Sequence, residues 1–169
     1  MLPLRYESSG CVPASMSQVF AHIDDPTRLA SHMRKGSWRM AGGQMNTETD
    51  AGRGQTVGSR IRLSGRVVGV ELSVEELVVE RDPPRRKVWA TTGTPKLLVI
   101  GHYRMGFELS PQANGSMLRV FIDYALPERA PTRWLARLFS RYYARWCTRQ
   151  MVDDAVEHFA TRTATHLPT

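Results

Sequence analysis

Residues 132–164 read TRWLARLFSRYYARWCTRQMVDDAVEHFATRTA, and this stretch alone has the length and pattern of a long helix. Pro127 marks its entry and Pro131 stands near its first turn, where a missing backbone N–H costs little. The chain from about residue 39 to 125 has the pattern of strands instead. A helix and a sheet need the same apolar partner, so the helix should lie across the sheet. The sequence therefore predicts an α+β protein.

Two apolar stripes run along this predicted helix, and they do not line up. At about 100° per residue, one side carries Leu135, Leu138, Phe139, Tyr142 and Trp146. A second side, rotated from the first by more than about 90°, carries Val152, Ala155, Val156 and Phe159. One straight helix cannot turn both stripes toward the same sheet. We therefore expect a kink or break between Tyr142 and Gln150, or a first half that packs on something else.

Arginine recurs at every fourth position of this helix, from Arg129 to Arg149. Side chains four residues apart are helix neighbours, so they form a positive ridge. Two interpretations stay open: the ridge is a solvated face, as is usual for charged residues, or it docks on anionic lipid headgroups or an acidic protein. For the second interpretation the candidate residues are Arg133, Arg137, Arg141 and Arg145.

Local signals predict the remaining elements. A strand covers residues 2–11, a capping box at residues 15–18 starts a short helix over residues 16–23, and Asp25-Pro26 starts another that ends near Met33. After a weak pattern over residues 37–49, strands are predicted over residues 56–67, 69–79, 85–92, 97–109 and 117–125, with turns at 82–84, 93–95 and 114–115. In the second of these strands the apolar set changes face at Glu75-Glu76, which predicts a β-bulge there.

Length and charge limit the class of protein. A chain of 169 residues is one domain by its size. Its 23 Lys and Arg against 16 Asp and Glu give a net charge of +7, which favours anionic partners. Cys11 and Cys147 make neither a disulfide framework nor a metal cluster, and thiols in a reducing compartment are expected. Without a signal peptide or a membrane-spanning run, we expect a cytoplasmic protein, membrane-peripheral if the ridge binds lipid.

Five segments carry a resemblance to a known superfamily: VPASMSQVFAHIDDPTRLASHM (12–33), RDPPRRKVWATTG (81–93), GHYRMGFELSP (101–111), FIDYALP (121–127) and YYARWC (142–147). They resemble bacterial members of the START/Bet v 1-like (SRPBCC) superfamily, of the polyketide cyclase/dehydrase and lipid-transport type. The resemblance implies a single domain over residues 1–169 with a helix-grip fold. In that fold a curved antiparallel sheet of about six or seven strands, with two short helices after the first strand, is gripped by a long C-terminal helix over a cavity.

Alternation along the strands identifies the side chains that face this interior. In residues 101–109, Tyr103, Met105 and Phe107 share one face, opposite His102, Arg104 and Glu108. Applied to all strands, the rule gives these candidate ligand-binding residues: Ile61, Leu63, Leu72, Val74, Trp89, Tyr103, Met105, Phe107, Ile122 and Tyr124. An apolar lining with a few hydroxyl groups is typical of a small-molecule site. The alternative is that these side chains pack together as a solid core.

The same rule counts against an enzyme. General acid–base catalysis needs a titratable group within reach of the substrate. The tempting candidates, His102, Arg104, Glu108 and Asp123, all fall on the face opposite the apolar one. A phosphate-binding loop, metal-ligand spacing and a nucleophile elbow are also missing, so we expect neither a metal nor a cofactor.

Three functions stay open. The first is binding or transport of a small hydrophobic ligand (a lipid, quinone, polyketide or sterol-like molecule) between sheet and helix, as the resemblance implies. The second is a cyclase or dehydratase that uses the hydroxyl groups of Tyr103 and Tyr124. The third is a membrane-peripheral adaptor that docks through its arginine ridge. Nucleic acid is not expected as a partner, because no motif that reads it accompanies the charge.

Overall fold

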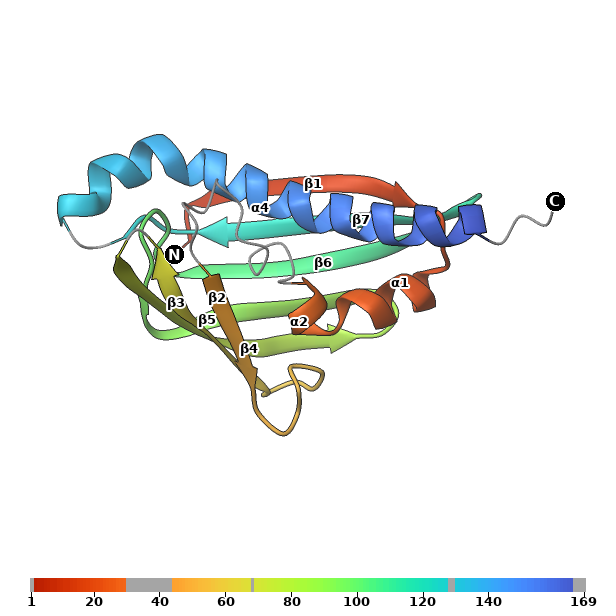
Figure 1. The fold of residues 1–169 in the computed structure, drawn as a ribbon, viewed down its shortest axis with the longest axis horizontal. Helices are drawn as coiled ribbons and strands as arrows, with labels where there is room; N and C mark the ends of the chain where they lie inside the picture. Colours follow the sequence, from red (N-terminus) through yellow and green to blue (C-terminus); the bar gives the residue numbers. More distant parts are fainter. Residues whose placement is uncertain (1, 30–43, 68, 128–129, 166–169) are drawn as a thin grey trace.

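The computed structural model describes residues 2–29, 44–67, 69–127 and 130–165. Its elements follow in the order β1 (Leu4–Val12), α1 (Met16–Ile23), α2 (Pro26–Leu29), β2 (Gln44–Thr49), β3 (Arg60–Val67), β4 (Val70–Asp82), β5 (Arg86–Lys96), β6 (Tyr103–Gln112), β7 (Gly115–Tyr124) and α4 (Ala130–Thr165). The strands form one antiparallel seven-stranded sheet in the order β1-β7-β6-β5-β4-β3-β2. The sheet curves around α4, which runs along β1 and β7 (Figure 1). The predicted α+β architecture is confirmed.

The short helices begin where the sequence places them. The Ser15 side chain accepts a hydrogen bond from the backbone N–H of Gln18, and the Gln18 side chain accepts one from the Ser15 N–H. This is the predicted capping box, and it starts α1 at Met16. The second helix begins at Pro26, with the Asp25 carboxylate accepting from the Thr27 N–H. Its predicted extension to Met33 lies outside the described residues.

A buried ion cluster attaches these helices to the sheet. Asp24, at the end of α1, accepts hydrogen bonds from Lys87 of β5 at 2.8 Å and from Arg81 of β4 at 2.8 Å. Burial alone would raise the pKa of Asp24, but the bonds from Arg81 and Lys87 outweigh burial and lower it below its usual value. The Lys87 side chain is almost completely enclosed. Removing the Asp24 carboxylate would leave Arg81 and Lys87 without the hydrogen-bonded counter-charge that they share.

Several predicted strand boundaries are wrong: β3 begins at Arg60 and not at residue 56, β4 continues beyond residue 79 to Asp82, and the boundaries around residues 93–97 also differ. No turn separates strands at residues 93–95, because β5 continues to Lys96, which pairs with Ser73 of β4. The connection to β6 consists of residues 97–102, so β6 begins at Tyr103 and not at Leu97. In this part of the pair β5 has two more residues than β4, because the five residues from Thr92 to Lys96 lie opposite the three from Ser73 to Glu75.

The predicted bulge at Glu75-Glu76 is also misplaced. The extra residue of β4 is Val79. Val78 pairs with Trp89 and Glu80 pairs with Val88, and because Trp89 and Val88 are adjacent in β5, Val79 has no partner there. The face therefore does not change at Glu75-Glu76, and Val74, Glu76 and Val78 all point to the interior. Leu77 and Val79 misled the prediction, because they are apolar side chains on the outer face of the sheet.

The helix α4 is continuous from Ala130 to Thr165, so the expected break is not present. Its buried stripe in the first half consists of small residues, Ala136, Ser140 and Ala144, and it continues through Met151 and Ala155. Of the first predicted stripe, Leu138, Phe139 and Tyr142 are exposed, Trp146 is partly buried against the core, and the side chain of Leu135 lies outside the described part. Trp134, which the stripe did not include, is exposed as well. The two stripes therefore serve different surfaces of one helix.

Gly10 of β1 marks a close approach of α4 to the sheet. A Cβ atom at this position would lie 2.6 Å from Cγ1 of Val152. Carbon atoms pack at about 3.5–4.0 Å, so any side chain here pushes the helix away from β1. The glycine thus fixes how near the second half of α4 lies to the edge strand.

We predict that Gly10→Ala lowers the free energy of unfolding by about 1–3 kcal/mol through overpacking. In a Val152→Ala background the colliding methyl group is absent, so the same change should cost much less. Urea denaturation of the four proteins of this double-mutant cycle measures the coupling. Equal losses in both backgrounds would contradict the contact.

Candidate functional site

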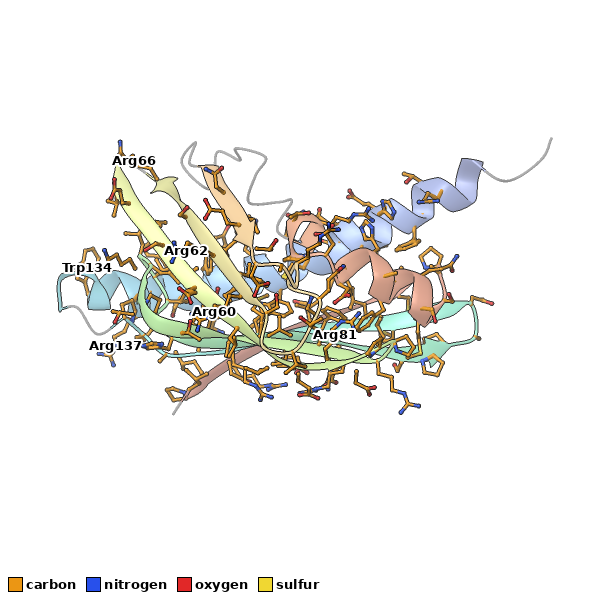
Figure 2. The ribbon with its side chains drawn as sticks, turned by 90° about the horizontal axis from the view of Figure 1, so that it is seen from below. Arg60, Arg62, Arg66, Arg81, Trp134 and Arg137 are labelled. Carbon is orange, nitrogen blue, oxygen red and sulfur yellow. The ribbon has the colours of Figure 1, made fainter. Side chains whose placement is uncertain are left out.

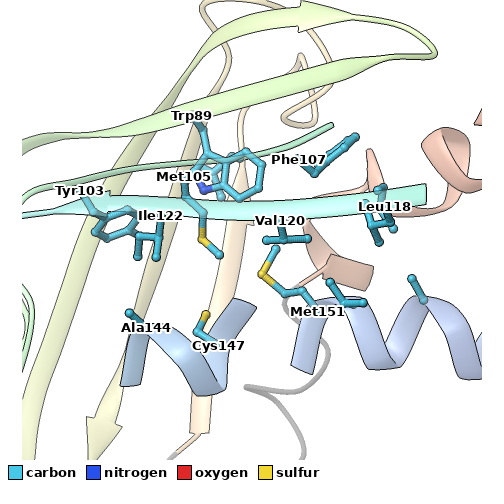
Figure 3. Close-up of a cluster of buried hydrophobic side chains, with 14 of the residues drawn as sticks. Trp89, Tyr103, Met105, Phe107, Leu118, Val120, Ile122, Ala144, Cys147 and Met151 are labelled. Carbon is cyan, nitrogen blue, oxygen red and sulfur yellow. The ribbon is translucent and has the colours of Figure 1, made fainter. Parts of the chain in front are cut away.

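The structure brings the predicted lining residues together. All are buried apart from Leu72, which is partly buried and packs against the others. Figure 3 shows Trp89, Tyr103, Met105 and Ile122 of the sheet, with Ala144 and Cys147 of α4 in the same cluster. Tyr103, Phe107 and Tyr124 point inward, as the alternation of β6 and β7 predicts.

A carboxyl group lies among these apolar side chains. Glu76 of β4 is 5% exposed and points inward between Val74 and Val78. Its side chain accepts hydrogen bonds from the Tyr103 hydroxyl and from the Trp89 side chain. Three adjacent strands, β4, β5 and β6, therefore supply the carboxyl group and its two donors.

The environment of Glu76 favours its neutral form. Burial raises its pKa from 4.5 to about 7, against the opposing effect of the Tyr103 and Trp89 hydrogen bonds and the Lys87 charge. A carboxyl group with a pKa near 7 exchanges its proton at neutral pH. It can thus accept or donate a proton within an interior that is otherwise apolar.

Helix α4 contributes two further groups to this cluster. Burial raises the pKa of Tyr143 and also that of Cys147, the latter to about 12, and the negative charge of Glu76 adds to both shifts. Burial and the Glu76 charge likewise raise the pKa of Tyr103. All three groups are therefore protonated at neutral pH. Cys147 is not a nucleophile in this state, because the thiolate is the reactive form.

The ionisable residues that the alternation rule assigns to the outer face do lie there. His102 is exposed, and Asp123 pairs with Arg5 at 2.9 Å. Glu108 pairs with Arg119 and Arg86, and Arg104 lies 3.7 Å from Glu80. None of the four reaches the interior.

Sequence reasoning missed Glu76 and Lys87, the charged side chains that the described strands bury. For Glu76 a signal existed, since it continues the period-two spacing of Leu72 and Val74. The argument against catalysis therefore covers only the outer-face residues. Glu76 differs from them in position: it lies in the interior, where burial raises its pKa to about 7.

The predicted anionic-partner surface is partly described. Arg137, Arg141 and Arg145 are exposed on α4, while the side chain of Arg133 lies outside the described part. In the described part of the chain, no helix has the length and apolar character that crossing a membrane requires.

The family model for polyketide cyclase / dehydrase and lipid transport proteins matches residues 4–163. The chain belongs to this family. Membership supports a role in binding a hydrophobic ligand or in cyclisation. No curated protein matches the chain significantly.

Solved structures of other proteins agree with the fold. The Zhui aromatase/cyclase from Streptomyces sp. R1128 superposes with a TM-score of 0.70 at 13% identity, over 95% of each chain. A protein from Chromobacterium violaceum gives 0.61 at 18% identity, over 93% of this chain and 97% of its own. Ara h 8.0201 gives 0.61 at 13% identity, over 91% and 98%. The chain therefore has a Bet v 1-like helix-grip fold, as the resemblance implies.

The raised pKa of Glu76 leads to a pH-dependent stability. Glu76 has a higher pKa folded (about 7) than its ordinary value of 4.5, so its ionisation has no cost in stability below pH 4.5 and destabilises the fold progressively as the pH rises to about 7. The full effect corresponds to about 3 kcal/mol. Glu76→Gln resembles the neutral acid and cannot ionise, so we predict that its advantage over the wild type grows across this window and then levels off.

Urea denaturation of both proteins between pH 4.5 and 8 measures this difference. Other titrating groups, such as His22 with its lowered pKa, are present in both proteins and cancel. A difference that stays constant with pH would show that Glu76 titrates alike in the folded and unfolded chains.

Proposed function

We propose that the protein binds a hydrophobic molecule that carries a carbonyl or hydroxyl group, in the interior between the sheet and α4. The observation that carries this proposal is the Glu76–Tyr103 hydrogen bond within a cluster of apolar side chains. Apolar walls supply affinity, and a few convergent polar groups orient the ligand. Neutral Glu76 donates one proton to a ligand oxygen, and the Tyr103 hydroxyl, which donates to Glu76 in this structure, would turn its one proton to the same ligand oxygen.

A hollow at one end of the sheet supports this proposal. It has a volume of about 270 Å³ and is lined by Leu72, Leu97, Leu98, Leu126 and Pro127 among others. Leu72 is also one of the predicted lining residues and packs against the buried core. The hollow also includes His102, the chain neighbour of Tyr103. Its apolar walls suit the entry of a hydrophobic ligand from this end.

Glu76 also favours a second candidate function, cyclisation or dehydration of a polyketide-like substrate. In such a reaction a carboxylate takes the proton from a carbon next to a carbonyl group, and a neutral hydroxyl group stabilises the enolate oxygen that forms. Glu76, with a pKa of about 7, suits the first role, and Tyr103 suits the second. The aromatase/cyclase structures of the same fold make this class of reaction a reasonable one to test.

Ligand binding is tested with three probes: oleate, a short-chain ubiquinone and the aromatic polyketide emodin. Native mass spectrometry of the purified protein detects any molecule that co-purifies with it. We expect at least one probe to raise the melting temperature, since a ligand that binds only the folded state stabilises it. Tyr103→Phe should weaken that binding about tenfold by removing one hydrogen bond. Tyr142→Phe makes the same chemical change on an exposed side chain and should have no effect.

Two results would contradict the binding proposal. One is the absence of any co-purifying molecule together with no thermal shift from any probe. The other is equal affinity in Tyr103→Phe and wild type. The Glu76→Gln variant distinguishes the two candidate functions. In an enzyme this change should abolish turnover of a bound substrate, whereas a carrier catalyses no reaction that the change could affect.

A further inference from the structure

The first half of α4 presents its large apolar side chains to solvent. Trp134 is 62% exposed, Leu138 66% and Tyr142 60%, and they follow each other at intervals of four. The opposite side of the same half carries the small buried residues Ala136, Ser140 and Ala144. An amphipathic helix normally directs its large apolar residues to the core. Here Tyr143 and Trp146 do pack against the core, but the apolar row of Trp134, Leu138 and Tyr142 points to solvent and needs another partner.

A row of arginines runs beside this apolar row. Arg137, Arg141 and Arg145 are exposed and lie about 60° around the helix from it. None of the three forms an ion pair with any residue in the described ranges. The sequence has no Asp or Glu from residue 129 to 152, so this face carries positive charge only. Trp134 and Arg137 lie at the same end of the molecule as Arg66 at the β3–β4 hairpin (Figure 2).

The combination of charge and apolar area identifies the partner. A second copy of the chain would bring two positive faces together, which is unfavourable. An anionic bilayer matches both rows: arginine pairs with lipid phosphates, and tryptophan and tyrosine suit the boundary between headgroups and acyl chains. A helix with this division lies in the plane of the interface. We propose that the first half of α4 docks the protein on an anionic lipid bilayer, through Trp134, Leu138 and Tyr142 with Arg137, Arg141 and Arg145.

This docking would place the apolar hollow close to lipid. Leu126 and Pro127 line the hollow and come just before Ala130, the first residue of α4. A hydrophobic ligand could then pass between bilayer and protein over a short distance. Only this last step rests on the proposed function; docking itself depends on the exposed face alone.

Vesicle co-sedimentation tests the proposal on the full chain. The vesicles contain phosphatidylcholine alone, or phosphatidylcholine with about a quarter phosphatidylglycerol. We expect binding to the second kind only. Arg137→Glu with Arg141→Glu should weaken binding at least about thirtyfold, since each basic residue at an anionic surface contributes about fivefold. Arg53→Glu with Arg85→Glu makes the same change in net charge at other exposed positions and should have a much smaller effect.

The apolar row is tested separately. Trp134→Ser with Leu138→Ser should weaken binding at least about tenfold, because less apolar area enters the interface. Val57→Ser with Val79→Ser removes two exposed apolar side chains elsewhere and should leave binding unchanged. Raising the salt from about 0.1 M to about 1 M shortens the screening length from about 10 Å to about 3 Å and should weaken wild-type binding.

Three outcomes would overturn the proposal. They are absence of binding to anionic vesicles, equal weakening by the two charge-reversal pairs, and a wild-type dimer in solution that the Trp134 and Leu138 changes dissociate. Circular dichroism of each variant confirms that the comparison is between folded proteins. Soluble-probe binding measured on the same variants keeps this test apart from the proposed function, because none of these substitutions is in the interior.

Discussion

The carboxyl group of Glu76 has to be satisfied by protein groups, because the sheet and α4 exclude water from it. Tyr103 and Trp89 provide that satisfaction, and their positions depend on the register of β4, β5 and β6. A one-residue slip in β4 would turn Glu76 outward and bring a neighbour into the core. The Glu76 side chain thus connects the register of the sheet with the packing of α4 above it and with the polar character of the interior.

The two functions proposed for this chain use opposite sides of α4. Small residues such as Ala144 let the helix lie close to the sheet and enclose the interior that holds Glu76. The large residues of the same half, Trp134 among them, remain outside beside a row of arginines. One helix can therefore close a hydrophobic site and present a docking face. This division also explains why the helix runs unbroken: neither stripe has to reach the partner of the other.

Sequence reasoning succeeds where a single periodicity decides the structure. The order of elements, the α1 cap and the inward faces of β6 and β7 follow from alternation and capping, because one face of each strand is buried. It fails where a side chain departs from the apolar-inside rule. Glu76 is inside because Tyr103, distant in sequence, donates to it, while Val79 lies outside at a bulge. Contacts between residues on different strands decide whether such side chains lie inside or outside, and a local sequence pattern does not reveal these contacts.

The central claim is that Glu76 is a water-excluded acid that stays protonated near neutral pH. Infrared difference spectroscopy tests it directly, because a protonated carboxyl group has a C=O stretching band that is separate from that of a carboxylate. At pH 6, where ordinary Glu residues are ionised, the wild type should show this band, and Glu76→Gln should lack it. The band of the wild type should disappear with a midpoint near pH 7. Its disappearance near pH 4.5, the ordinary value of a glutamate, would contradict the account.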